Sequence, residues 1–548
     1  MSETGNNDAD VIIIGAGPAG MLAALLLARH GLSSHIVERR RKIAETPRAH
    51  AVNGKTIEIS STAGIPAEEI YVAGMPVRRG GMVNFWSTLS GTYLGGLPYE
   101  RQDDAVLELA PYRLVNISQP RFEAILENHV TANPGISLSR GMQCTGFSQD
   151  DRGVTAIVQS GEGREETLKG DYLIAADGAG SPLRRQMGIE MEGPDALQHF
   201  MTIHFHADLS ELIGDKPGIL HWIMEPTAAA ALISYDDGQN WVLMHNCPPD
   251  GEDPALYDEV RCRGLVAAAL GRNDVEFTIH TIDPWVMTAQ VAVQYRKHRA
   301  FLVGDAAHRF PPAGGLGLNT GVGDAQNLAW KLAAVKKGVA GPVLLDSYEA
   351  ERKPVAETNS AQSLENAMRM IELIGFLLGP DPENMQTHFD TICQHAESST
   401  ELAGAIAAQK LHFDSLRLQI GYSYGGHDDT ALGIDDYRPQ FRIGDCLPHC
   451  AVNHKQATLP LIELVQSGHF TLLLRDNQEV PPISDERLDI MRDGIDFTGN
   501  WSEQLAAWDD NLAALLVRPD GHIAAHFLAG SVSEKNVSAA IARVLANQ

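Results

Sequence analysis

The sequence predicts an α/β fold that begins with a Rossmann-type domain, carries an inserted β-sheet, and ends in a small separate α/β unit. The first observation is a strand–helix–strand pattern near the start of the chain. Residues 10–14 are apolar and β-branched, residues 18–30 form a helical pattern that stops at Gly31, and residues 34–38 return to strand. Two parallel strands joined by a helix need a right-handed crossover, so a doubly wound sheet is expected.

The second observation is a change of pattern in two separated segments. Residues 75–113 and 189–294 carry alternating strands such as 200–207 and 241–247, which indicates one sheet layer built from both segments. Between and after them, residues 172–177 and 300–305 are apolar strands that each end in Asp and should rejoin the first sheet. We therefore expect a discontinuous first domain at 1–74, 114–188 and 295–375, and an inserted mixed or antiparallel sheet domain at 75–113 and 189–294.

The last third of the chain changes character again. A helix is expected at 319–337, with further helices to about 411 and a helical connection over 376–430. Residues 421–442 are rich in Gly, Asp and Tyr and are typical of a linker. Within 431–548, strands at 470–474 and 514–517 and a final helix after Ser533 indicate a separate α/β domain.

Composition excludes several function classes. The 548 residues have an ordinary globular composition and a formal net charge of -27, which disfavours nucleic acid and anionic membranes as partners. The chain has no secretory signal pattern, so we expect a cytoplasmic protein, with a homodimer as an open possibility. The six cysteines form no CxxC pair and no metal-like spacing, so no metal site is expected.

A glycine-rich turn after the first strand carries the first functional signal. Gly15, Gly17 and Gly20 form a GxGxxG pattern with Pro18 and Ala19 between the last two glycines. The glycines permit the tight turn, the approach of a pyrophosphate and close helix packing, and the helix N-terminus attracts the phosphates. Glu38 ends the second strand, where a carboxylate can accept hydrogen bonds from ribose, and Arg39 follows it. The pattern predicts a dinucleotide site but does not distinguish FAD from NAD.

Two later motifs resemble those of the flavoprotein aromatic hydroxylases. They are the Asp-Gly motif from Ala176 to Arg184, which contains Asp177, and the Gly-Asp motif from Gly304 to His308, which contains Asp305. The resemblance implies FAD, with Asp305 holding the ribityl chain and the segment around Asp177 handling FAD and the nicotinamide cofactor. It also implies a Rossmann-type (GR2-like) FAD-binding domain.

A glycine-rich loop follows the second motif. It contains Pro312, Gly315, Gly317, Leu318 and Asn319 and leads into the long helix. Glycines let the backbone lie flat against a planar ring, and the helix N-terminus suits the negative charge of reduced flavin. We expect this loop to lie beside the flavin.

Two further segments are similar to the family. The segment 47–50 with Arg48 is expected near the flavin or its pyrophosphate, and Gln119 is expected to hydrogen-bond the ribityl chain. The resemblance covers essentially the whole chain. It is strongest to the branch of phenol and hydroxybiphenyl hydroxylases and of polyketide and indolocarbazole tailoring oxygenases, which carries a C-terminal thioredoxin-like domain. Cys446 and Cys450 are four apart rather than three, so that domain is interpreted as structural.

The implied activity is FAD-dependent monooxygenation. In this family NADPH or NADH reduces FAD as a transient donor, O2 forms a flavin C4a-hydroperoxide, and its distal oxygen is transferred to a phenolic or polycyclic aromatic ring. The chain has no second GxGxxG, which fits a transient nicotinamide cofactor. Alternatives are a Baeyer–Villiger-type tailoring oxygenase and a flavin protein that sequesters a reactive intermediate. A plain NAD-dependent dehydrogenase would not need the later motifs.

One histidine is the candidate catalytic base. A phenol reacts faster when it loses its proton, and His50 is the candidate base, with a structural hydrogen bond as the alternative. His308 is expected to brace the loop that follows the Gly-Asp motif. Residues of the inserted sheet could line an aromatic pocket or form ordinary core. The pocket candidates are Trp86, Trp222, Met224, His245 and Pro312.

Overall fold

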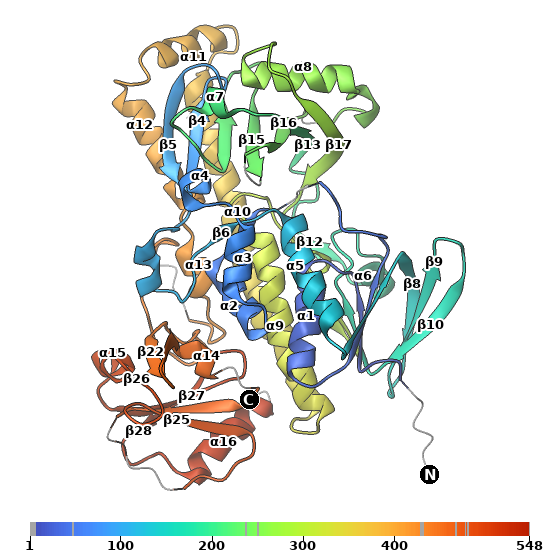
Figure 1. Cartoon of the computed structure of the whole chain (residues 1–548), viewed down its shortest axis with the longest axis vertical. Coiled ribbons are helices and arrows are strands. Elements are labelled where there is room, and N and C mark those ends of the chain that lie inside the picture. Colours follow the sequence, from blue (N-terminus) through green and yellow to red (C-terminus); the bar gives the residue numbers. More distant parts are fainter. Residues whose placement is uncertain are drawn as a thin grey trace.

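The computed structural model describes residues 7–46, 49–235, 238–248, 251–427, 432–465, 468–476, 478 and 482–546. Figure 1 shows three parts: a central domain, a sheet domain above it and a smaller domain below it. The predicted α/β class is confirmed. The domain limits given above remain predictions, although the strands of each sheet come from the segments expected.

The central domain is built on a six-stranded sheet. Its order is β19-β20-β11-β1-β2-β7, and every neighbouring pair is parallel except β19 with β20. The strands are β1 (Val11–Ile14), β2 (Ser34–Glu38), β7 (Ile136–Arg140), β11 (Tyr172–Ala175), β19 (Arg296–Lys297) and β20 (Ala300–Leu302). The two strands expected to rejoin the first sheet, β11 and β20, are therefore confirmed as neighbours.

Helices cover this sheet and position its functional turns. The central ones are α1 (Pro18–Arg29), α5 (Gln119–Ala132) and α9 (Leu316–Lys336), and α1 packs against both of the others. Shorter elements complete the domain: β3 (Ala51–Val52), α2 (Gly54–Thr62), α3 (Ala67–Ala73), α4 (Val77–Gly80), β6 (Val115–Asn116), α6 (Pro182–Gln186), β12 (Met191–Glu192), β18 (Gln290–Ala292) and β21 (His308–Arg309). An antiparallel sheet of β8 (Met142–Gln149), β9 (Val154–Ser160) and β10 (Glu165–Gly170) projects to one side (Figure 1).

The inserted domain is a seven-stranded sheet in the order β17-β13-β16-β15-β14-β4-β5. All neighbours are antiparallel except β4 with β14, so the sheet is mixed. Its strands are β4 (Met82–Trp86), β5 (Tyr93–Pro98), β13 (Gln198–His206), β14 (Leu220–Ile223), β15 (Ala230–Tyr235), β16 (Asn240–Asn246) and β17 (Thr278–Met287), and α7 (Ser210–Ile213) lies in a connection.

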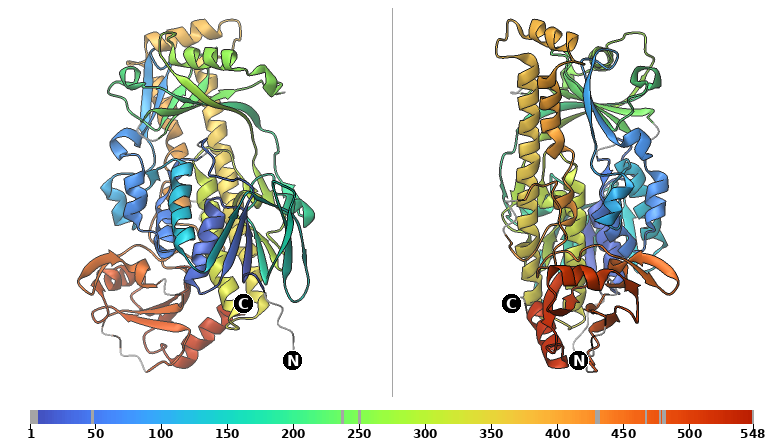
Figure 2. Two further views of the ribbon diagram at one scale, coloured as in Figure 1. Left: turned by 45° about the vertical axis from the view of Figure 1, so that its right-hand side comes forward. Right: turned by 90° about the vertical axis from the view of Figure 1, so that its left-hand side faces the viewer.

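The two faces of this sheet form two separate hydrophobic clusters. On one face, residues of α8 (Glu259–Leu270) pack on the strands. On the other face, residues of α10 (Ser347–Leu378), α11 (Met385–Gln394) and α12 (Thr400–Ala407) pack on them. Because α10 has 32 residues, it reaches from the central domain to the inserted sheet, as Figure 2 shows. The two domains therefore share one rigid element.

The C-terminal domain is an α/β unit around a four-stranded sheet in the order β25-β24-β27-β28. Its elements are β22 (Ala451–His454), β23 (Ala457–Pro460), α14 (Leu461–Val465), β24 (Phe470–Leu474), β25 (Leu488–Arg492), β26 (Thr498–Gly499), α15 (Trp501–Trp508), β27 (Leu512–Val517), β28 (Ile523–Leu528) and α16 (Glu534–Leu545). The predicted strands and final helix are confirmed, and Ser533 caps that helix. A thioredoxin-like topology remains a prediction.

The segment expected as a linker, residues 421–442, also packs against the C-terminal domain. After α13 (Leu416–Ile420), the described residues of 421–442 contain no regular helix or strand, as predicted. Tyr422 and Tyr424 are nevertheless half-buried, and the Tyr424 ring stacks on His522 of the C-terminal domain at 4.0 Å between ring centroids. This segment therefore packs in the seam between two domains.

Candidate active site

The glycine turn after β1 has the close contacts that its residue types require. Gly15 has a φ of +112°, and a Cβ there would lie 2.1 Å from the Ala176 carbonyl oxygen. A Cβ on Gly20 would lie 2.1 Å from the Gly15 carbonyl oxygen. A Cβ on Gly17, by contrast, would meet nothing within 4 Å, and α1 has no side-chain N-cap. The turn is closed on the protein side and open on the other, where its free N–H groups can bind an anion.

Glu38 lies at the end of β2 and is fixed against this turn. Its Oε2 accepts a hydrogen bond from the Ala16 N–H at 2.9 Å, and its Oε1 accepts one from the Arg40 N–H at 2.8 Å. Each carboxylate oxygen can still accept a second hydrogen bond, so the group suits a ribose diol. Arg39 is exposed beside it.

The Asp-Gly motif meets the same turn. Asp177 Oδ2 accepts a hydrogen bond from the Leu183 N–H at 3.2 Å, while its buried Oδ1 has no hydrogen-bond partner among the described residues. Burial raises the pKa of Asp177. Arg184 of the same motif donates to the Ala306 carbonyl at 3.1 Å, which ties this motif to the Gly-Asp motif. An unsatisfied buried carboxylate oxygen indicates a missing ligand or water.

The Gly-Asp motif is held by a buried carboxylate beneath it. Asp324 of α9 accepts hydrogen bonds from the Gly304 N–H at 3.2 Å, from His308 Nε2 at 2.8 Å and from Arg352 Nε at 2.8 Å. Although burial raises the pKa of Asp324, the charges of His308 and Arg352 outweigh it and keep the pKa below its usual value. His308 is therefore a brace, as predicted, and the Asp305 carboxylate is exposed at the turn.

The glycine loop after this motif presents an uncapped helix. Gly314 and Gly315 have φ values of +100° and +63°, and α9 begins directly after them without a side-chain N-cap. A Cβ on Gly315 would lie 2.9 Å from the Ala51 Cβ and 3.4 Å from the Tyr99 hydroxyl oxygen. The loop thus faces a narrow space, and the exposed Pro312 lies at its start.

Asn319 fixes this loop from behind. Its Oδ1 accepts hydrogen bonds from the Asn53 N–H and the Thr56 hydroxyl, at 3.0 and 2.7 Å. Its Nδ2 donates to the Ala51 and Gly315 carbonyls, at 3.0 and 2.7 Å. Both amide protons are used within the protein, so the side chain suits a positioning role better than direct contact with a cofactor.

These features fit an FAD molecule. The space over Gly17, the uncapped starts of α1 and α9, the unpartnered oxygen of Asp177 and the exposed Asp305 all lie along the carboxyl ends of the central strands. Ligands bind at this edge of open α/β sheets. Gln119 begins α5 and donates to Glu123 at 2.7 Å. Its contact with the ribityl chain stays a prediction. Arg48 lies outside the described residues.

His50 lies where the central domain meets the inserted sheet. Its Nδ1 is 3.0 Å from Asn116 Oδ1, while the Asn116 amide group donates to the Gly80 carbonyl at 2.9 Å. Because the Asn116 oxygen can only accept, His50 carries its proton on Nδ1 and keeps Nε2 as an acceptor. Burial lowers the pKa of His50 to about 4, so the ring is neutral at physiological pH.

Two tyrosines that the motifs did not single out complete this region. The ring centroids of Tyr99 and Tyr235 lie 5.6 and 6.0 Å from that of His50. Both come from the inserted sheet domain, at positions where no motif or spacing marks them. They could be found only once the sheet was placed against the glycine loop.

The structure divides the predicted pocket residues between the two faces of the inserted sheet. Trp222 and Met224 belong to the cluster that also contains Ala51 and Tyr99, next to the glycine loop. Trp86 belongs to the opposite cluster, under α8. His245 lies near Tyr257 at 6.2 Å between ring centroids, and Tyr257 is part of that same opposite cluster. The structure therefore brings Trp222 and Met224 to the candidate site but not Trp86 or His245, because alternate residues of a strand face opposite sides.

The fold and the site together define an FAD-binding flavoprotein, and comparison with protein families agrees. Residues 8–363 match the model of the FAD binding domain family, and residues 440–547 match that of the aromatic-ring hydroxylase C-terminal domain. The chain belongs to the FAD-dependent aromatic-ring hydroxylase family. The predicted enzyme class, an FAD-dependent aromatic monooxygenase, is confirmed.

Individual relatives support this placement. The chain is 33% identical to aklavinone 12-hydroxylase DnrF of Streptomyces peucetius over 69% of this chain and 78% of that protein. It is 30% identical to 4-methyl-5-nitrocatechol 5-monooxygenase of a Burkholderia species, over 94% of this chain and 93% of that protein. The crystal structure of the flavin-dependent monooxygenase PieE with FAD and substrate matches 99% of this chain and 100% of that one, with a TM-score of 0.88 and 28% identity.

The chain matches only part of the length of some relatives. Alignments with two further Streptomyces relatives, at 36% and 35% identity, span only 57% and 64% of those proteins. Among the described residues, no helix combines the length and apolar character needed to cross a bilayer.

Proposed function

We propose that this protein hydroxylates a phenolic or polycyclic aromatic compound with O2 and NADPH or NADH. The carrying observation is the neutral His50 ring, whose acceptor nitrogen belongs to a cluster with Tyr99 and Tyr235 beside the glycine loop. A phenol placed there would have a hydrogen-bond acceptor for its hydroxyl group and the edge of the flavin site within the same space. The relatives named for aklavinone and for 4-methyl-5-nitrocatechol support an aromatic substrate of this kind.

In this proposal the central domain holds FAD through Gly15, Gly17, Gly20, Glu38 and Asp305. Bound FAD supplies the electron transfer from the nicotinamide cofactor and the activation of O2. The N-terminus of α9 directs its positive end at the flavin, where it stabilises negative charge. With no second glycine fingerprint in the sequence, the nicotinamide cofactor binds transiently and leaves after reduction.

His50 accepts the hydrogen bond of the substrate hydroxyl group and takes up its proton as the ring is attacked. Asn116 holds the ring in the tautomer that makes this possible. Trp222 and Met224 provide apolar surface on the same side and help exclude water. An imidazole that burial keeps neutral has a free nitrogen lone pair and can accept this proton.

The test is a screen of the purified flavoprotein with NADPH and with NADH. Substituted phenols and polycyclic quinols are added, and consumption of the nicotinamide cofactor, consumption of O2 and products are measured. We expect an aromatic substrate to accelerate consumption of the nicotinamide cofactor and to gain one hydroxyl group. Ring-opened lactones would instead indicate Baeyer–Villiger chemistry, and a bound product without stimulated turnover would indicate sequestration. Either result would overturn the proposal.

A further inference from the structure

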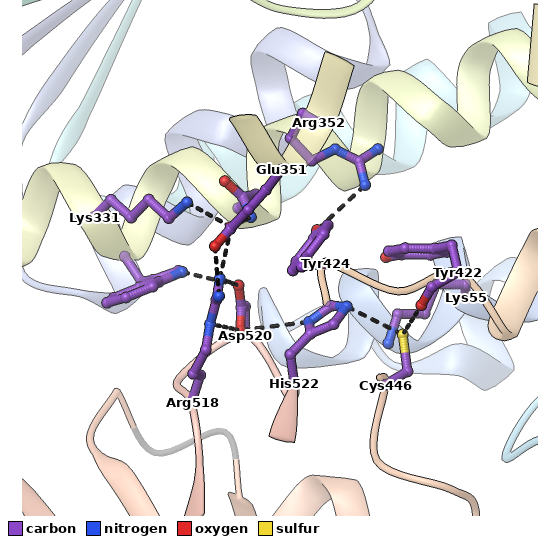
Figure 3. A network of polar contacts seen from close by, with 12 residues as sticks. Lys55, Lys331, Glu351, Arg352, Tyr422, Tyr424, Cys446, Arg518, Asp520 and His522 are labelled. Carbon is purple, nitrogen blue, oxygen red and sulfur yellow. Dashed lines mark hydrogen bonds and ion pairs between the residues drawn. The ribbon is translucent and has the colours of Figure 1, made fainter. Parts of the chain in front are cut away.

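The seam between the C-terminal domain and the central domain contains a dense group of buried charges (Figure 3). Arg518 donates to both Glu351 oxygens at 2.6 and 2.9 Å, and Lys331 also contacts Glu351 at 2.6 Å. Asp520 pairs with Arg518 at 2.6 Å and accepts from the Trp330 indole N–H at 3.0 Å. A cysteine and a histidine lie at the edge of this group.

That cysteine is Cys446, whose thiol faces His522. Cys446 Sγ lies 3.2 Å from His522 Nε2 and 3.6 Å from the Tyr422 carbonyl oxygen. On its other side, His522 Nδ1 lies 3.4 Å from Asp520 Oδ1. Sulfur, imidazole and carboxylate therefore follow one another in a row, and the side chains of His522 and Asp520 are almost wholly buried. In this order a carboxylate stabilises an imidazolium, which in turn stabilises a thiolate.

The surrounding charges favour the same ionised pair. Burial by itself raises the pKa of the Cys446 thiol, but His522 and Lys55 outweigh burial and lower it below its usual value. Burial also lowers the pKa of His522, yet Cys446 and Asp520 outweigh that effect and raise it to about 9. Lys55 comes from α2 and pairs with Glu58 at 2.6 Å. The Glu58 carboxylate acts against Lys55, because its negative charge raises the pKa of the Cys446 thiol. The contacts with His522 and Lys55 therefore favour the thiolate–imidazolium form of the pair.

Other groups face the pair as well. The hydroxyl groups of Tyr422, Tyr424 and Tyr437 lie in the same region, and burial raises the pKa of each, so all three are neutral. Arg352 of α10 donates to the Tyr424 hydroxyl at 3.2 Å. Among these groups, His522 and Lys55 lower the pKa of Cys446 and Glu58 raises it.

The other cysteines differ from Cys446 in this respect. Cys450, only four residues away, donates to the Asn500 side-chain oxygen at 3.1 Å, and burial raises its pKa to about 11. Burial likewise raises the pKa of Cys144 and of Cys393 to about 11. Among the described residues, no group of three or more His, Cys, Asp or Glu side chains is arranged to hold a metal ion. Cys446 therefore differs from these three cysteines in its contact with a histidine and in its lowered pKa.

A small cavity lies near this pair. Its volume of about 20 Å³ is enough for about one water molecule, and it is lined by Lys55 and Tyr422, which both act on Cys446. Its other walls include Leu316, Asn319 and Thr320 at the start of α9, behind the glycine loop. Cys446 itself is buried and is not among the residues that line this cavity.

We propose that Cys446 is a peroxide-oxidised thiolate site in which His522 is the proton donor. The thiolate sulfur attacks one oxygen of hydrogen peroxide, the S–O bond forms and the O–O bond breaks. The leaving hydroxide takes the proton of the His522 imidazolium and becomes water. The sulfur is oxidised by two electrons to a sulfenic acid, and the peroxide is reduced by two. The reaction leaves a neutral imidazole beside Asp520, within the C-terminal domain.

The test exposes the FAD-loaded protein to a small excess of hydrogen peroxide and traps sulfenic acid with a dimedone-type probe, with peptide mass spectrometry as the readout. We expect Cys446 to be trapped on the order of tenfold faster than Cys450, because an ordinary thiol is only a few per cent ionised at neutral pH. Cys450→Ser is the matched control and should leave the rate at Cys446 unchanged. His522→Asn should slow trapping at Cys446 about tenfold. Equal rates at both cysteines, or no trapping at Cys446, would overturn the proposal.

The pH profile of the unmodified chain tests the same point without relying on a variant that folds poorly. The trapping rate at Cys446 should rise as the thiol ionises and fall again as pH increases through about 9, where His522 loses its proton. A thiol that is merely accessible would react faster with increasing pH and show no such fall. A monotonic rise through that range would contradict the role of His522.

Discussion

The FAD site and the C-terminal seam differ in how the fold treats polar groups. At the FAD site, α1 and α9 begin without side-chain caps, glycines replace side chains, and one buried oxygen of Asp177 has no partner in the described chain. At the seam, Arg518, Glu351 and Asp520 are buried or nearly so, and each is matched by opposite charge at hydrogen-bond distance. The FAD site leaves hydrogen-bonding groups open towards a ligand, whereas these three charged side chains at the seam use theirs on one another.

This difference separates binding from structure. Unsatisfied buried groups are costly, so a fold that retains them does so where a ligand completes them. A paired charge network serves instead to hold one arrangement, because removing one member leaves its partners uncompensated. The comparison predicts that substitutions at the seam act mainly on stability, while substitutions at the FAD site act on ligand binding and turnover.

The largest effect is expected at the seam from Glu351→Ala. This change leaves Lys331 and Arg518 without their shared carboxylate in a buried position, which costs about 3–5 kcal/mol of unfolding free energy. Urea unfolding measures the loss. The control is Glu166→Ala, which breaks the exposed pair with Arg164 and should cost about 0–1 kcal/mol. Equal losses in the two variants would contradict the assignment of the seam as a structural network.

The next effect is expected on turnover from His50→Ala. Loss of the acceptor for the substrate hydroxyl group should lower kcat by about 100-fold, a typical contribution of a positioned base. His245→Ala is the matched control, because that histidine lies on the opposite face of the inserted sheet, and its kcat should change little. Steady-state kinetics with a phenolic substrate provides the measurement. A similar loss in both variants would mean that the substrate does not bind between His50 and the glycine loop.

A somewhat smaller effect is expected on cofactor affinity from Asp305→Ala. A hydrogen bond to a charged group contributes about 1.5–3 kcal/mol, so FAD should bind roughly 10- to 100-fold more weakly. Flavin titration of the apoprotein followed by fluorescence measures this. Asp283→Ala removes an exposed carboxylate from β17 and should leave the affinity unchanged. Unaltered flavin affinity in Asp305→Ala would show that the ribityl contact lies elsewhere.

Near neutral pH, the smallest effect is expected from the protonation of buried neutral histidines. Burial lowers the pKa of His412 to about 3 and that of His221 to about 4. Below pH about 6.5 the unfolded chain takes up these protons while the folded chain does not. The contribution of the two histidines to the free energy of unfolding is therefore fully present above that pH and is lost as pH decreases towards 4. Each group contributes at most about 1.4 kcal/mol per pH unit. His412→Gln should flatten this slope in urea unfolding, whereas replacing the exposed His206 by Gln should not.

Sequence patterns predicted the parts of the molecule that depend on local order. The strands β1, β2, β11 and β20 and the glycine turn follow from apolar runs and glycine spacing, because each is encoded by neighbouring residues. The enzyme class followed from three motifs in the right order. The side sheet β8–β10 was not anticipated, because its short, half-exposed strands carry weak signals.

The candidate site was predicted less completely, for a physical reason. Which face of the inserted sheet meets the flavin depends on how that sheet docks, so strand patterns could not separate Trp222 from Trp86. Tyr99 and Tyr235 meet His50 only through the same docking. Cys446 and His522 come together through the tertiary packing of the C-terminal domain, so their spacing in sequence gave no sign of the pair.

The central claim is that this chain uses bound flavin to place one oxygen atom from O2 on an aromatic ring. The most direct measurement is turnover of a phenolic substrate under oxygen-18 gas, followed by mass spectrometry of the product. The account predicts a hydroxylated aromatic product that carries one oxygen-18 atom. A product whose new oxygen comes from water, or no oxygenated product while the nicotinamide cofactor is consumed, would contradict it.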